Sequence, residues 1–172
     1  VLLNANPRRD AAGKIVGVVG VGQDITERIA QEQEYVRLID TANAPIFGID
    51  VEGNLTEWNK KAADITGYSQ DEMLGRNLVE AEVILPEFKP SVRQVISNAL
   101  GGINTENFEL PLYSQQGQRV ELLLNATTRH SANDVVVGVV MVGQDITEKK
   151  DMEKAQIAAA KARAASDAKG KF

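Results

Sequence analysis

The chain has 172 residues, a formal net charge of −5 and no cysteine. This length suits one compact domain with helical extensions, and the lack of thiols excludes disulfides, thiolate metal sites, cysteine nucleophiles and thiol-linked chromophores. No apolar run approaches the roughly 20 residues that span a bilayer. The sequence also has no block of basic residues of the kind that binds nucleic acid, so we expect no nucleic-acid partner. We expect a cytoplasmic segment without membrane contact. Because it opens at Val1 inside a strand pattern, we interpret it as part of a longer protein.

Two apolar, β-branched runs open the chain, at residues 1–6 and 14–21. The polar segment between them contains Asp10 and Gly13, so the pattern predicts a β-hairpin. An isolated two-stranded hairpin is marginally stable at best. We therefore expect the following helix or a second chain to order it.

A repeat fixes the length of the structural unit. The sequence GQDITE occupies Gly22–Glu27 and recurs at Gly143–Glu148, 121 positions later. The similarity extends back through the apolar runs that precede each copy. Each copy therefore closes a β-rich unit and opens a helix.

Both copies place an aspartate and a glutamate at the spacing of a helix-capping box. Asp24 and Glu27 predict a connector helix at Thr26–Thr41, and Asp145 and Glu148 predict a helix that continues toward the end of the chain. Alanine, lysine and glutamate favour this second helix by propensity.

The segment between these helices alternates strand and helix patterns. It contains two strands around a turn at Gly53, two short helices stopped by Gly67 and Gly75, an amphipathic helix and three further strands. The expected longer elements are strands at 46–49, 55–58, 108–112, 120–126 and 135–142 and a helix at Lys89–Leu100.

Several short motifs in this segment are typical of one family: Asp50 and Gly53, Trp58-Asn59, Thr66-Gly67-Tyr68 and Gly75-Arg76-Asn77. With them the segment resembles a PAS domain of the sensory type. The resemblance implies an α+β PAS fold, in which a five-stranded antiparallel sheet of order 2-1-5-4-3 carries short helices on one face. The implied organisation is the last two strands of a preceding PAS domain at 1–26, a connector helix at 27–43, a PAS domain at 44–147 and a signalling helix at 148–172.

The stretch GRNLVEAE also resembles the GRNCRFLQ motif of blue-light LOV domains. In that comparison the photoactive cysteine falls on Leu78, the phosphate-binding arginine on Val79, the two flavin-binding asparagines on Leu112 and Leu122, and the switching glutamine on Gly143. Each lost hydrogen-bond partner would leave a polar group of a bound flavin buried and unpaired, at a cost of about 1–3 kcal/mol. We therefore expect no flavin.

The only histidine, His130, lies in a turn, and the helix that would supply a haem ligand has none, so we expect neither haem nor a metal. Strand alternation predicts that apolar side chains line one face of the sheet. We favour a cup filled by these side chains over one that holds a small apolar or aromatic ligand. The predicted lining is Leu78, Ile96, Leu110, Leu112, Leu122, Leu124, Val139 and Met141.

The terminal sequence Ala168-Lys169-Gly170-Lys171-Phe172 resembles the segment before the phosphorylated histidine of sensor histidine kinases. Small residues recur three and four apart along this helix, so we expect a homodimer through Met152, Ala155, Ala159 and Ala162, with Ile29 and Val36 on the connector helix.

The resemblances imply a non-enzymatic module that dimerises and relays a signal to a histidine kinase in the same chain. The alternative is a PAS sensor that binds a small ligand or chromophore and controls a cyclase or transcription factor. The expected signal junctions comprise Asp24, Thr26, Glu27, Gly143, Asp145, Thr147 and Glu148.

Overall fold

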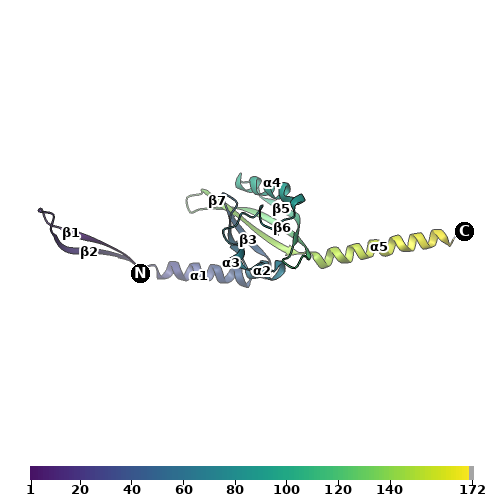
Figure 1. Cartoon of the computed structure of the whole chain (residues 1–172), viewed down its shortest axis with the longest axis horizontal. Helices are drawn as coiled ribbons and strands as arrows, with labels where there is room; N and C mark the ends of the chain where they lie inside the picture. Colours follow the sequence, from purple (N-terminus) through teal and green to yellow (C-terminus); the bar gives the residue numbers. More distant parts are fainter. Residues whose placement is uncertain (171–172) are drawn as a thin grey trace. The chain divides into compact units, whose positions relative to one another are not determined.

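The computed structural model describes residues 1–170, and Figure 1 labels most of its elements. The chain divides into two units, Val1–Ile39 and a second that begins at Asp40. Lys171 and Phe172, which belong to the predicted kinase-like motif, lie outside the described residues.

The first unit opens with the expected hairpin. Strands β1 (Leu2–Arg9) and β2 (Ile15–Gln23) pair antiparallel. Asp10 shapes the turn, since its Oδ1 accepts hydrogen bonds from Ala12 N and Lys14 N at 2.9 Å each. Helix α1 (Thr26–Thr41) follows with the predicted bounds and buries no residue.

The second unit is built on a five-stranded antiparallel sheet. Its strands are β3 (Ile46–Asp50), β4 (Leu55–Trp58), β5 (Thr105–Tyr113), β6 (Arg119–His130) and β7 (Val136–Asp145). They lie in the order β4-β3-β7-β6-β5, which is the order 2-1-5-4-3 counted within the domain. The predicted α+β PAS fold is therefore confirmed.

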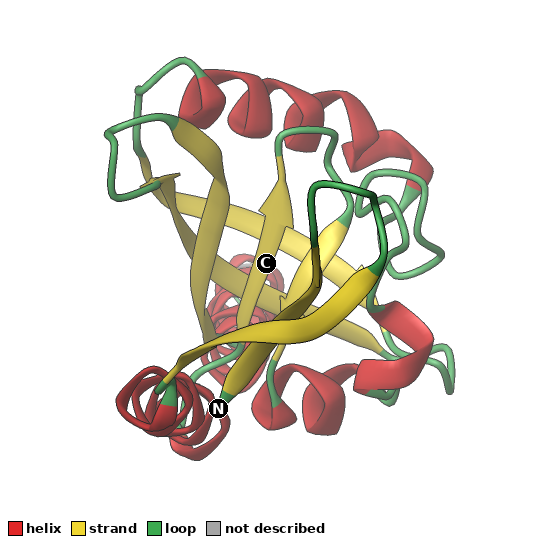
Figure 2. Ribbon diagram, turned by 90° about the vertical axis from the view of Figure 1, so that its left-hand side faces the viewer, coloured by secondary structure: helices red, strands yellow, loops and turns green. Residues whose placement is uncertain are grey.

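Short helices connect β4 to β5. They are α2 (Lys60–Thr66), α3 (Gln70–Met73), the 3-10 turn η1 (Pro86–Phe88) and α4 (Lys89–Leu100). Figure 2 shows α4 lying across the curved sheet. Helix α3 ends at Met73 and not at Gly75 as predicted, because its C-cap Leu74 leaves the helical conformation, with φ of −57° and ψ of 136°.

The core lies between α4 and the sheet. Helix α4 buries Val92, Val95, Ile96 and Ala99, the stripe that its period predicts. All eight residues of the predicted cup lining are buried in the same apolar cluster. At roughly 25 cal/mol per Å² of apolar area, such burial is the main stabilising term of the fold.

The motif residues hold turns in place. The Asn59 side chain accepts hydrogen bonds from Ile46 N at 2.9 Å and Ala62 N at 3.0 Å and donates one to Ala44 O. Trp58 Nε1 donates to Tyr68 O at 3.0 Å. Gly67 ends α2 with φ of 79°, a conformation that glycine adopts without steric cost. The motifs that carry the PAS resemblance are therefore structural.

Helix α5 (Thr147–Lys169) leaves the sheet after β7 and buries no residue of its own. No helix within residues 1–170 has the length and apolar character needed to cross a membrane.

Candidate functional site

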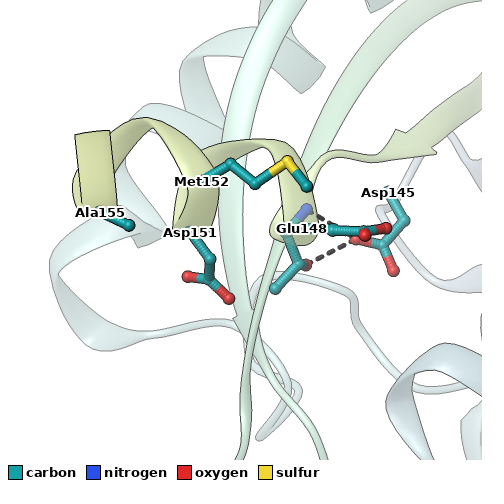
Figure 3. Close-up of a pocket in the computed structure, with 6 residues that line it drawn as sticks. Asp145, Glu148, Asp151, Met152 and Ala155 are labelled. Carbon is teal, nitrogen blue, oxygen red and sulfur yellow. Dashed lines mark hydrogen bonds between the residues drawn. The ribbon is translucent and has the colours of Figure 1, made fainter.

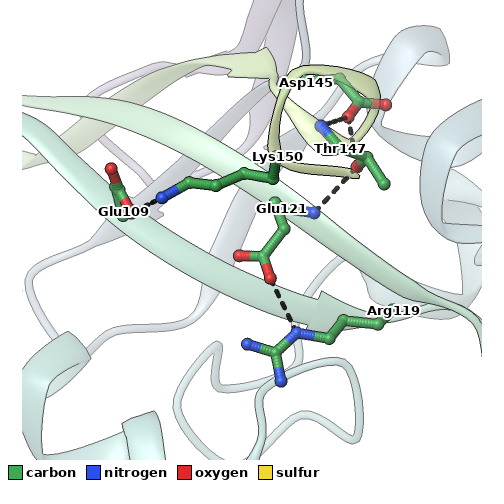
Figure 4. A network of polar contacts seen from close by, with 6 residues as sticks. All are labelled: Glu109, Arg119, Glu121, Asp145, Thr147 and Lys150. Carbon is green, nitrogen blue, oxygen red and sulfur yellow. Dashed lines mark hydrogen bonds and ion pairs between the residues drawn. The ribbon is translucent and has the colours of Figure 1, made fainter. Parts of the chain in front are cut away.

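The end of β7 and the start of α5 form the best-defined polar site of the second unit, shown in Figure 4. Asp145 Oδ1 accepts hydrogen bonds from Thr147 N at 2.9 Å and from Thr147 Oγ1 at 2.5 Å. Thr147 Oγ1 in turn accepts one from Glu121 N at 2.9 Å. A hydroxyl has a single proton. Because that proton points to Asp145, the oxygen is free to accept from β6.

Strand β6 is bonded to the helix start through both backbone groups of Glu121. Its carbonyl accepts a hydrogen bond from Ile146 N at 2.9 Å, while its N–H donates to Thr147. The Glu121 carboxylate is buried and pairs with Arg119 Nε at 2.8 Å. The helix start therefore follows the position of β6.

A second contact joins the first turn of α5 to the edge strand β5. Lys150 Nζ donates to Glu109 Oε2 at 2.7 Å, and this hydrogen bond raises the pKa of Lys150 above its ordinary value. The Lys150 and Glu109 side chains are 29% and 54% exposed. Ion pairs of this exposure contribute little stability and are weakened by salt, so the contact can break without unfolding the domain.

The predicted capping box of Asp145 and Glu148 is wrong in its partners. Asp145 binds the backbone and side chain of Thr147, two residues later, and Ile146 is the N-cap, with no side-chain cap hydrogen bond. The first junction shows the same geometry, since Asp24 Oδ1 accepts from Thr26 N at 2.9 Å and from Thr26 Oγ1 at 2.6 Å. Aspartate often binds backbone two residues on in this way.

The hydroxyl of Thr26 holds the Asp24 carboxylate in its charged form, and together with the Thr26 amide it lowers the pKa of Asp24.

Gly143 lies in β7, two residues before Asp145 of the second junction. A Cβ at Gly143 would meet Leu124 Cδ2 at 2.7 Å and Pro45 Cγ at 3.1 Å, so a larger residue here would require the Leu124 side chain to move.

An open hollow beside this junction is lined by Asp145, Thr147, Glu148, Asp151, Met152 and Ala155 (Figure 3). Met152 is 58% exposed. The predicted dimer residues Ala155, Ala159 and Ala162 are also exposed, as are Ile29 and Val36 on α1.

A second hollow lies between the β3–β4 turn and α4. Its lining combines apolar and polar groups, and within the described residues Ile96 is the one member of the predicted cup lining that contributes to it. Glu80, at its rim, pairs with Lys89 at 3.3 Å and Arg93 at 2.8 Å. The lining residues are Val51, Glu52, Gly53, Asn77, Val79, Glu80, Arg93, Ile96, Ser97 and Leu100.

The residues at the LOV-like positions belong to the core. Leu78, Leu112 and Leu122 are fully buried, and Val79 is nearly so. His130 ends β6 and is exposed. Residues 1–170 contain no group of three or more metal-ligating side chains.

Comparison with known proteins agrees with the architecture. The family model described as PAS fold matches residues 33–146. The chain is 39% identical over 132 residues to phytochrome B1 of Solanum lycopersicum and 38% identical over 148 residues to phytochrome B of Arabidopsis thaliana, covering 74% and 84% of the chain. It spans only 12% of the length of each of these relatives.

Two solved structures share the fold. The PAS domain of a Colwellia psychrerythraea protein superposes with a TM-score of 0.60 at 18% identity, covering 69% of this chain and 98% of that one. An RNA-binding light-oxygen-voltage receptor superposes with a TM-score of 0.60 at 19% identity, covering 92% of this chain and 43% of that one.

Proposed function

This chain belongs to the PAS family and carries a sensory PAS domain, and we propose that the domain relays a conformational signal through α5 to a histidine kinase in the same polypeptide. The module acts in the cytoplasm as a homodimer, and catalysis belongs to the downstream kinase and not to this segment. Support for a kinase comes from the alanine-rich terminal sequence and its resemblance to the segment before the phosphorylated histidine.

The junction between the sheet and α5 carries the proposal. Helix α5 has no buried residue, and its first turn is bonded to the domain through Thr147 and Lys150. A shift of β6 or β5 changes the distance from Glu121 N to Thr147 or from Glu109 to Lys150. The helix then leaves the sheet at another angle.

The ion pair between Lys150 and Glu109 provides the sharpest test of the proposed relay through α5. In the full parent protein, Lys150→Met and Glu109→Gln should each alter kinase autophosphorylation several-fold, while leaving the melting temperature of the PAS domain nearly unchanged. The charge exchange Lys150→Glu with Glu109→Lys should restore the normal level. Lys154→Met, on the same helix, is the matched control because the described residues provide Lys154 with no ion pair. Unchanged output in both single variants would refute the relay.

The hollow beside α4 favours a second function, the binding of a small molecule with both apolar and polar groups by a PAS sensor that controls a cyclase or transcription factor. Val79 and Ile96 are buried core residues that also line this hollow, so an occupant there would touch the core directly. Native mass spectrometry and an absorbance scan of the purified chain test this. A bound mass that is lost in Ile96→Trp supports binding, and an apo mass with no chromophore band contradicts it.

A further inference from the structure

The β1–β2 hairpin has the same pairing register as the β6–β7 hairpin. Leu2 pairs with Gln23 and Leu123 with Gln144, so the register is the same after the shift of 121 positions. Both hairpins also carry their irregularity at the equivalent place, after Arg8 and after Arg129. Bulges are features of a particular sheet and add local twist. The first hairpin therefore has the geometry of the closing hairpin of a PAS sheet.

The second hairpin shows what such a hairpin contacts. Strand β7 pairs with β3 along Gly138–Val142, and β6 pairs with β5. Leu122, Leu124 and Val139 point into the core and are fully buried. Their equivalents Val1, Leu3 and Val18 are 78%, 73% and 69% exposed. The first hairpin thus presents an apolar core face and two unpaired edges, which folded proteins normally cover.

A comparison of Gly138 in β7 with its equivalent Gly17 in β2 indicates what kind of strand would lie next to β2. Gly138 has φ of 157°, and a Cβ there would lie 1.9 Å from Ile49 O, because β3 passes directly over it. Gly17 is the equivalent residue, yet a Cβ at Gly17 would meet nothing within 4 Å. Glycine weakens a strand interior and marks a bulge or a close backbone approach. Gly17 therefore fits a strand that approaches as β3 does.

Within the second unit, β3 has no free edge. Strand β3 already pairs with both β4 and β7. We propose that β1–β2 closes a second PAS sheet whose other strands come from an upstream segment of the same polypeptide. One strand of that segment pairs antiparallel with the free edge of β2 along Gly17–Val21, and its backbone passes over Gly17. This inference rests on the PAS fold and is independent of the kinase relay.

Alanine substitutions at the two glycines test the proposal. In the 172-residue chain, Gly138→Ala should lower the melting temperature by 5 °C or more, and Gly17→Ala should leave it unchanged within about 1 °C. In a parent chain extended upstream, Gly17→Ala should also lower the melting temperature of the upstream transition by several degrees. A neutral Gly17→Ala in the extended chain would overturn the proposal.

Hydrogen exchange of the unmutated proteins provides a readout that does not depend on whether a variant folds. In the extended chain, the amides of Gly17–Val21 that do not bond to β1 should exchange at least 100-fold more slowly than in the 172-residue chain, and at rates comparable to their equivalents in Gly138–Val142. Equal fast exchange in both chains would refute the proposal. Protection that rises with the concentration of the 172-residue chain would also refute it, because a second copy would then be the partner.

Discussion

At the scale of single residues, Thr147 is the side chain on which the helix junction depends. Its hydroxyl both donates to Asp145 and accepts from Glu121 N. A serine can do the same and a valine cannot. The geometry therefore makes the hydroxyl, and not the size of the side chain, the functional feature.

We predict that Thr147→Val lowers the free energy of unfolding by about 1–3 kcal/mol, because the Glu121 N–H loses its partner in a part-buried site. Thr147→Ser should lose less than about 1 kcal/mol. Urea denaturation of the whole chain measures both values. Equal losses in the two variants would show that the hydroxyl does not matter.

Asn59 has the same kind of role in the fold that Thr147 has at the helix junction. Its side chain is buried and satisfies Ile46 N, Ala62 N and Ala44 O. Asn59→Ala should cost about 2–4 kcal/mol, because it removes a helix cap and leaves buried backbone groups unpaired. Asn98→Ala, which removes only an exposed side-chain contact to Gln94, is the control and should cost less than about 0.5 kcal/mol. Chemical denaturation distinguishes these outcomes.

At the scale of elements, Glu80 joins the loop after α3 to α4. Hydrogen bonds from Arg93 and Lys89 lower the pKa of Glu80 below its ordinary value of 4.5. A lowered folded-state pKa stabilises the fold above the unfolded-state pKa, and this stability disappears as pH falls through the folded-state pKa.

We therefore predict that wild type is more stable than Glu80→Gln at pH 7 and that the difference shrinks as pH falls below 4.5 toward 3. The difference should also shrink in 1 M salt, since all three side chains are at least partly exposed. Arg93→Gln should weaken the same pH dependence. A difference between wild type and Glu80→Gln that stays constant from pH 7 to pH 3 would contradict this assignment.

How well these elements could be predicted depends on how far apart in sequence the interacting residues lie. The bounds of α1 and α4 were predictable because Pro45 after α1, Pro90 at the start of α4 and the apolar period of α4 are local signals. Ser69 and Glu72 have the spacing of a capping box, and the structure contains this box. The same spacing failed at Asp145, since the intervening Thr147 offers a closer partner.

The candidate site was predictable only in part, for the same reason. The repeated sequence GQDITE indicates where the junction lies. The ion pair could not be predicted in this way, because Lys150 and Glu109 lie 41 residues apart in sequence. No local pattern pairs them. The hollow beside α4 was also missed, because its lining comes from a turn, a loop and a helix that only the fold brings together.

At the scale of the whole molecule, the two units place equivalent junctions at the starts of α1 and α5. In each, an aspartate holds a threonine at the first turn of an exposed helix. One difference separates them, because Ile29 takes the place in the first junction that Lys150 has in the second. The relay proposal thus has an exposed apolar residue, Ile29, at its entry and an ion pair at its exit.

The dimer proposal can be tested on α5, whose alternating spacing places Met152, Ala155, Ala159 and Ala162 on one stripe. In a parallel coiled coil these positions face the partner helix. We predict that Ala159→Glu shifts the chain from dimer toward monomer by at least tenfold in dissociation constant, because it buries like charges against each other. Ala164→Glu, on the opposite side of the same helix, adds the same charge and should leave association unchanged. Sedimentation equilibrium over a range of protein concentrations measures both, and equal weakening in the two variants would mean that charge alone, and not this stripe, controls association.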